Sequence, residues 1–156
     1  KPVKKARDCQ DFKFKPENLG PRSPMNTDLI DMHQDLYSIL KSCVDDYAKY
    51  WGINVVYYEA FNFVKYESPG QEFKVHADHG PAYNCTVSAV IYLNDDYEGG
   101  EFEICDHTVN SHPNASDIKS RGTVTFIPSF LEHKANKVTK GKRYSLACWF
   151  DGPKWR

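Results

Sequence analysis

After Gly52 the sequence consists of short runs rich in β-branched and aromatic residues, with turn signals between them and no second helical pattern. Strands that follow one another without interleaved helices favour antiparallel pairing over a parallel βαβ sheet. Seven or eight such strands behind a helical layer are typical of a jelly roll, so we predict a mainly β fold of this kind. The predicted strands cover residues 54–66, 72–77, 85–94, 100–105, 122–128, 133–138 and 142–150.

The stretch before Gly52 has a helical period instead. Apolar residues recur there every three to four residues or at twice that spacing, N-cap residues begin at Asn26, and the glycine is a natural stop. This pattern predicts one long amphipathic helix or two shorter ones. The basic, proline-containing start of the chain predicts a solvated arm. The expected map is an N-terminal arm over 1–25 and a single domain over 26–156, with a helical part over 26–52 and a jelly-roll core over 53–151.

Composition excludes several classes of protein. The 156 residues suit one domain, and a formal charge of −1 gives no positive field for nucleic acid or an anionic membrane. No run of 18 apolar residues occurs, so we expect no membrane span. The five cysteines form no paired motif, which favours a reducing, cytoplasmic location over a disulfide framework. The chain begins with Lys1 and not Met, so removal of an earlier signal peptide stays an open alternative.

The predicted strand over 72–77 runs into three possible metal ligands. His76 and Asp78 are two residues apart and therefore share one face of a strand. His133, about 55 residues after Asp78, opens a later strand and is the best-placed third ligand. Two histidines and one carboxylate leave half of an octahedron open, as in non-haem Fe(II) oxygenases, although ordinary histidines can match such a pattern by chance. His79 would lie on the opposite face, so we expect it outside the coordination sphere.

A basic residue follows the last of these ligands at a useful spacing. The segment from His133 onward is predicted as a hairpin that turns at 139–141. That pairing puts Arg143 about four residues, or roughly 13 Å, from the level of His133, a span that suits a short dicarboxylate. Arg143 shares a strand face with Trp149, opposite an apolar face. We therefore expect Arg143 to point inward, where a bound carboxylate would offset the cost of burying it.

Two tyrosines are further candidates for binding residues. Tyr92 belongs to a strand with a mixed polar face opposite a fully apolar one, which suits a strand beside a binding site. Tyr66 ends the strand before the loop that leads to His76. Either phenol could donate a hydrogen bond to a carboxylate, and either could equally be structural. The long polar connection over 106–120 is typical of a functional lid.

Four segments, taken together, resemble conserved blocks of 2-oxoglutarate- and Fe(II)-dependent prolyl 4-hydroxylases, in a compact bacterial or viral form. The segments are HAD (76–78), YLNDDYEGGEF (92–102), FIPSFLEH (126–133) and GKRYSLACWF (141–150). The resemblance implies a double-stranded β-helix, a jelly-roll variant. It also implies that His76, Asp78 and His133 are the catalytic metal ligands, and that Arg143, Tyr92, Tyr66 and Trp149 bind the co-substrate.

The resemblance further implies Fe(II), 2-oxoglutarate, O2 and ascorbate as cofactors, release of succinate and CO2, and hydroxylation of a peptide. Arg143 replaces the lysine of collagen-type enzymes and is similar to the arginine of oxygen-sensing prolyl hydroxylases and of lysyl hydroxylases. We expect a peptidyl proline in a Pro-rich segment as substrate. Trp149 stands where nucleic-acid demethylases carry a second arginine, so nucleic acid is not expected.

Two alternatives stay open. One is a lysyl hydroxylase of the same mechanism, for which an acidic group near the iron would meet the lysine ammonium. The candidates for that group are Glu101, Glu103 and Asp106. The more distant alternative is a non-catalytic, metal-binding jelly-roll module. The oligomeric state is not predicted.

Overall fold

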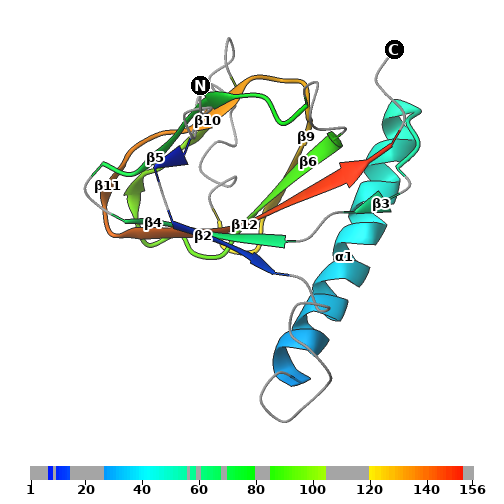
Figure 1. Cartoon of the computed structure of the whole chain (residues 1–156), viewed down its shortest axis with the longest axis horizontal. Coiled ribbons are helices and arrows are strands. Elements are labelled where there is room, and N and C mark those ends of the chain that lie inside the picture. The colour runs from blue at the N-terminus through cyan, green and yellow to red at the C-terminus, as the bar shows by residue number, and fades with distance from the viewer. Residues whose placement is uncertain are drawn as a thin grey trace, which may run out of the picture.

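The structure is a computed structural model of the chain. It describes residues 7–8, 10–14, 27–55, 57–58, 61–67, 70–79, 85–104 and 120–152. In this part of the chain, one long helix, α1 (Thr27–Trp51), lies beside a stack of strands (Figure 1). The mainly β fold with an N-terminal helix is therefore confirmed, and the helical period gives one helix instead of two. No described helix has both the length and the hydropathy needed to cross a membrane.

The strands form two larger sheets and one small ribbon, and every pairing is antiparallel. The major sheet has the order β2 (Gln10–Phe14), β4 (Phe61–Glu67), β12 (Lys142–Asp151), β6 (Cys85–Tyr92), β9 (Val124–Pro128), with β3 (Tyr57–Tyr58) also pairing with β12. The minor sheet has the order β1 (Arg7–Asp8), β5 (Glu72–His76), β10 (His133–Ala135), β8 (Phe102–Ile104). The ribbon pairs β11 (Val138–Lys140) with β7 (Glu98–Gly99).

The two faces of the major sheet pack against different parts of the protein. On the outer face, Leu40 and Val44 of α1 pack against apolar side chains of the sheet, among them Val87 and Phe150. On the inner face, Val64 of β4 and its neighbours pack against residues of β10 and β11. The alternation of β6 and β12 produces this division, because successive side chains of a strand point to opposite faces. The inner face is therefore the one that meets the minor sheet.

The predicted hairpin between His133 and Phe150 is wrong. The segment over 138–140 pairs with β7, and β12 pairs with β4 and β6 in the other sheet. Gly99 explains this path, because its φ of 74° and its missing side chain let the backbone of Lys137 approach closely. The chain therefore crosses from the minor sheet to the major sheet before β12 begins.

The expectation of a solvated arm is also wrong for part of the N-terminus. Residues 7–8 pair with β5, and residues 10–14 pair with β4 along their whole length. The alternation in QDFKF is a strand signal that the neighbouring lysines obscure. The remainder of the arm, the predicted lid over 106–120 and Asp106 lie outside the described residues.

Candidate metal centre and anion site

His76, Asp78 and His133 come together between the two sheets. One ligand atom of each lies within 4.8 Å of the others. His76 and His133 are direct cross-strand partners in the pairing of β5 with β10. The Nε2 atoms of His76 and His133 lie 3.4 and 3.5 Å from the two carboxylate oxygens of Asp78. The three ligand types predicted from the sequence therefore converge at one point.

A β-bulge brings His76 to that point. Regular alternation would put His76 on the face opposite Phe73. The pairing instead sets Phe73 against Ala135 and His76 against His133, so β5 uses one residue more than β10 over this interval. The rings of Phe73 and His76 stack with centroids 3.9 Å apart, while Val75 is left 50% exposed. The extra residue re-aims the imidazole into the space between the sheets.

Backbone carbonyls fix the orientation of both imidazoles. Nδ1 of His76 lies 2.7 Å from the Lys74 carbonyl, and Nδ1 of His133 lies 2.8 Å from the Leu131 carbonyl. A carbonyl can only accept, so Nδ1 of each ring carries a proton, and Nε2 is the ring atom that faces Asp78. Burial lowers the pKa of His133 below its usual value despite the nearby carboxylate. The neutral ring is the form that binds a metal ion.

Two buried serines hold the carboxylate of Asp78. The Ser88 hydroxyl donates to Oδ2 of Asp78 at 2.6 Å, and the hydroxyls of Ser88 and Ser129 lie 2.8 Å apart. Because the one hydroxyl hydrogen of Ser88 is used on Asp78, Ser129 is the donor in the second bond. The backbone N–H of Asp78 also donates to the Ser129 carbonyl at 2.9 Å. Sequence reasoning did not single out either serine, although the mixed polar face of β6 pointed to Ser88.

These contacts keep Asp78 ionised. Burial acts to raise the pKa of Asp78, but contacts with His76, His133, Ser88 and the Trp149 indole outweigh it and hold the pKa below its usual value. Trp149 thus lies at the metal end of the inner face. His79 makes a different contact, with Nδ1 2.9 Å from the Cys85 carbonyl, and it is not part of the three-residue cluster.

Arg143 is buried on the same inner face, with 1% of its surface exposed. Its guanidinium carbon lies 4.8 Å from the centroid of the Tyr66 ring and 5.3 Å from that of Tyr92. Tyr66 is its cross-strand partner on β4, and Tyr92 pairs with the nearby Ser145, whose hydroxyl accepts from Arg143 at 3.4 Å. The two predicted tyrosines therefore surround the predicted arginine.

No carboxylate among the described residues pairs with Arg143. Its Nε and the Tyr92 hydroxyl are buried and have no well-aligned hydrogen-bond partner in that part of the chain. Burial acts to lower the pKa of Arg143, but the surrounding tyrosine oxygens raise it above its usual value, so the guanidinium stays charged. A buried cation with an unpartnered Nε–H and no carboxylate partner in the described part of the chain is suited to an anionic ligand.

A third tyrosine and a glycine complete this end of the site, and sequence reasoning missed both. Tyr97 is buried beside Arg143, and burial raises the pKa of its phenol, which therefore stays protonated. Gly100 has a φ of 65°, and a Cβ there would lie 3.0 Å from Cδ of Arg143. Tyr97 and Gly100 belong to the YLNDDYEGGEF segment (92–102), so its paired glycines were the available signal.

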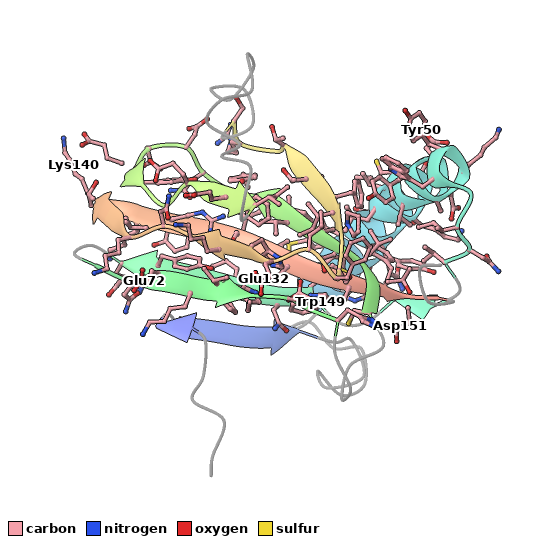
Figure 2. All side chains as sticks on the ribbon, turned by 90° about the horizontal axis from the view of Figure 1, so that it is seen from above. Tyr50, Glu72, Glu132, Lys140, Trp149 and Asp151 are labelled. Atoms are coloured by element: carbon pink, nitrogen blue, oxygen red, sulfur yellow. The ribbon has the colours of Figure 1, made fainter. Side chains whose placement is uncertain are left out.

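The cationic end and the metal end are separated along β12. Ser88, which holds Asp78, pairs with Trp149, six residues after Arg143. Figure 2 shows Lys140, just before β12, and Asp151, its last residue, at opposite ends of the strands, with Trp149 nearer to Asp151. Six residues correspond to roughly 20 Å between Cα atoms.

Two curated proteins are similar to parts of this chain. Human prolyl 3-hydroxylase 2 is 36% identical over 72 residues, which is 45% of this chain and 10% of that protein. A PKHD-type hydroxylase from Psychrobacter sp. (strain PRwf-1) is 32% identical over 78 residues, which is 49% of this chain and 29% of that protein. The chain therefore spans less than a third of the length of either relative.

Solved structures support the fold. A prolyl-4-hydroxylase from Pseudomonas putida matches with TM-score 0.59 and 21% identity over 98% of this chain and 77% of that one. A viral collagen prolyl hydroxylase from Paramecium Bursaria Chlorella virus-1, in a 2OG complex, matches with TM-score 0.63 and 16% identity over 94% and 80%. A Trichoplax adhaerens prolyl hydroxylase, in complex with a hypoxia inducible factor peptide, matches with TM-score 0.56 and 17% identity over 72% and 55%.

The family follows from a longer match. The family model of the 2OG-Fe(II) oxygenase superfamily matches residues 61–151, well over half of the chain. That interval contains the His76, Asp78 and His133 cluster, the buried Arg143 and all of the strands that carry them. This match agrees with a jelly roll that brings two histidines, one carboxylate and a buried arginine together from facing sheets, and the chain belongs to the 2OG-Fe(II) oxygenase superfamily.

Proposed function

We propose that this chain is a 2-oxoglutarate- and Fe(II)-dependent dioxygenase that hydroxylates a peptidyl proline within a Pro-rich segment. The observation that carries the proposal is an open His-Asp-His cluster between the two sheets, together with a buried Arg143 that has no acidic partner among the described residues. The first suits a redox-active metal ion and the second suits the far carboxylate of a dicarboxylic acid.

The donor set fits Fe(II). Two imidazoles and one carboxylate are the ligands of non-haem Fe(II) oxygenases, and they leave coordination positions open for co-substrates. His76, Asp78 and His133 would hold the ion through Nε2, a carboxylate oxygen and Nε2. The carbonyl contacts at Nδ1 and the serines on Asp78 hold these ligands in place before the metal binds.

The anion site fits 2-oxoglutarate. In the proposed complex Arg143 binds and orients the distal carboxylate, with the hydroxyls of Tyr92 and Tyr66 as further donors. Bound iron and 2-oxoglutarate would supply the oxidation itself, which consumes O2, releases succinate and CO2 and transfers one oxygen atom to the substrate. The protein's part is to position both partners and to keep water away from them, and Trp149 borders the metal end.

The contacts of one acidic candidate, Glu103, favour proline over lysine as the substrate residue. A lysine ammonium would need an unpaired acid close to the metal. Glu103 pairs with Lys134 at 3.3 Å and accepts from Asn136 at 3.0 Å. It lies across from Lys134, the neighbour of the inward-facing His133, and so on the other face of the minor sheet. Glu103 is therefore a poor partner for a substrate lysine.

The similar proteins support the same choice by analogy, since their names are those of prolyl hydroxylases. A Pro-rich segment in the polyproline II conformation loses little entropy on binding, and aromatic side chains such as Trp149 offer flat contacts to its rings.

The test is to incubate the Fe(II)-loaded protein with 2-oxoglutarate, with and without ascorbate, and with matched Pro-rich and Lys-rich peptides. We expect succinate and a gain of one oxygen on proline, detected by mass spectrometry. A gain on lysine alone would replace proline with lysine as the target. If neither succinate nor an oxidised peptide forms with any ion or peptide tried, the proposed reaction class is wrong.

A further inference from the structure

We propose that Asn62 is a co-substrate-binding residue whose side-chain amide donates a hydrogen bond to the carboxylate of the 2-oxo acid group, the end of 2-oxoglutarate nearest the metal. This inference rests on the proposed function, and it adds a polar contact between Arg143 and the metal cluster, nearer to the cluster.

Asn62 is buried, and its side-chain oxygen lacks a hydrogen-bond partner among the described residues. Its exposed fraction is 6%, and its Oδ1 atom is buried with no partner among the described residues. No side-chain hydrogen bond of Asn62 occurs within that part of the chain. An amide in this state costs free energy in the folded protein, whereas an apolar side chain of the same shape would be neutral or stabilising. Its presence is therefore better explained by a ligand than by the fold.

The side chain lies on the inner face of the major sheet. Val64 and Tyr66 of β4 pack against Ala135 and Val138 of the opposite strands, which identifies the inner face. Asn62 is two residues before Val64, so it shares that face. The intervening Phe63 packs instead on the side of α1. The amide therefore faces the same space as the proposed ligand residues.

The position of Asn62 along the sheet indicates which end of the co-substrate it would contact. Asn62 is the cross-strand partner of Ala147, which lies four residues after Arg143 and two before Trp149. Ala147 in turn pairs with Val90, two residues after the Ser88 that holds Asp78. The amide is thus about 13 Å along the strand from Arg143 and about 7 Å from the level of the metal cluster. A group bound to the metal is nearer to Asn62 than a group bound to Arg143.

The chemistry of the amide suits a carboxylate. The oxygen and nitrogen of an asparagine side chain exchange places by rotation of the amide, so the buried atom can be the N–H2 donor when an acceptor is present. A carboxylate oxygen accepts such a bond, and the bond is stronger because the acceptor is charged. Ala147, directly opposite, leaves space for the bound acid because its side chain is small.

The test uses the variants Asn62→Leu and Asn62→Asp, with Phe63→Leu as a control on the opposite face of the same strand. The affinity for 2-oxoglutarate is measured by calorimetric titration into protein loaded with Mn(II) under nitrogen, so no turnover is needed. We expect Asn62→Leu to weaken binding about 10- to 100-fold. Asn62→Asp should weaken it further by charge repulsion, and Phe63→Leu should leave it unchanged.

Two further measurements distinguish a ligand-binding role of Asn62 from a structural one. Asn62→Leu should weaken binding of pyruvate, which has the 2-oxo acid group without the distal carboxylate, by a similar factor. The melting temperature of the metal-free protein should stay the same or rise in Asn62→Leu and fall in Phe63→Leu. Unchanged 2-oxoglutarate affinity in Asn62→Leu, or a melting temperature that falls together with a normal affinity, would overturn the role of Asn62. Failure of the wild-type protein to bind 2-oxoglutarate would instead contradict the proposed function.

Discussion

Ser88 shows how a single residue can determine the geometry of a ligand. Its hydroxyl, itself held by Ser129, is the direct hydrogen-bond donor to Oδ2 of Asp78. Without it, the carboxylate would lose the contact that fixes its rotation, and a loss of this kind typically costs about 10- to 100-fold in metal affinity. We predict that Ser88→Ala weakens binding of Mn(II) or Fe(II) by this amount, as measured by titration with a competing chelator.

The control is Ser88→Thr, which keeps the hydroxyl and should keep the metal affinity close to that of the wild type. The melting temperature of the metal-free variants shows whether either protein is unfolded. Equal metal affinity in folded Ser88→Ala and wild-type protein would mean that the serine does not position Asp78.

Arg143 is the second residue whose environment leads to a quantitative expectation. We predict that Arg143→Gln raises the KM for 2-oxoglutarate roughly 30- to 1,000-fold, because a charge-assisted, bidentate contact contributes about 2–4 kcal/mol. Metal affinity should change little, since Arg143 is distant from the cluster along β12.

The matched control for Arg143 is its exposed neighbour. Lys142 makes a surface ion pair with Glu67, and such pairs contribute little. Lys142→Gln should therefore leave the KM close to the wild-type value. A KM that moves equally in both variants would argue for a general effect of charge and against a carboxylate at Arg143.

At the scale of elements, the ribbon of β7 and β11 determines how the chain reaches β12. Gly99 has a φ of 74°, and its backbone lies against Lys137 and Thr139 so closely that a side chain would clash. Gly122 also has a positive φ, of 90°, but nothing lies within 4 Å of the place where its Cβ would be. A comparison of alanine substitutions at the two glycines therefore separates two destabilising effects. Both would suffer from a side chain at positive φ, but only Gly99 would also suffer a steric clash.

We predict that Gly122→Ala lowers the free energy of unfolding by about 1 kcal/mol, the cost of holding a side chain at positive φ. Gly99→Ala should lower it by clearly more, because the clash adds to the same conformational cost. Urea denaturation at equilibrium measures both values. Equal losses in the two variants would show that the ribbon accommodates a side chain at Gly99.

At the level of elements, the sequence correctly predicted the strand faces that follow from local alternation. It missed the strand pairings that depend on contacts between distant segments. The faces of β6 and β12 follow from alternation with a period of two, so Tyr92 and Arg143 could be placed on the inner side. The pairing of β11 with β7 depends on a close contact at Gly99 between segments about 40 residues apart, and no local pattern shows it. The turn at 139–141 therefore looked like a hairpin.

The bulge in β5 shows the same limit at the site itself. The HAD spacing correctly brought His76 and Asp78 together, and His133 joins them as expected. Alternation along EFKVH, however, places Val75 inside, where the structure has His76. Ser129 and Tyr97 were missed because they reach the site from a turn and from an irregular segment, where no period indicates a direction. That these residues bind iron and 2-oxoglutarate remains a prediction.

For the whole molecule, the arrangement of parts is what supports an oxygenase. The helix α1 closes the outer face of the major sheet, so the polar residues of the inner face are left for a site between the sheets (Figure 1). The minor sheet contributes both histidines, and the major sheet contributes Arg143, Ser88 and the tyrosines. The proposed reaction needs both sheets, since neither holds the metal ligands and the anion site together.

The most direct test of this account follows the oxygen atoms. The Fe(II)-loaded protein is supplied with 2-oxoglutarate and a Pro-rich peptide under oxygen-18 gas. The masses of the products are then measured by mass spectrometry. A 2-oxoglutarate-dependent dioxygenase puts one atom of O2 into succinate and the other into the substrate. We predict oxygen-18 in both succinate and a hydroxyproline of the peptide. A hydroxylated peptide without labelled succinate, or labelled succinate with no oxidised proline in any peptide tried, would contradict the proposed prolyl hydroxylation.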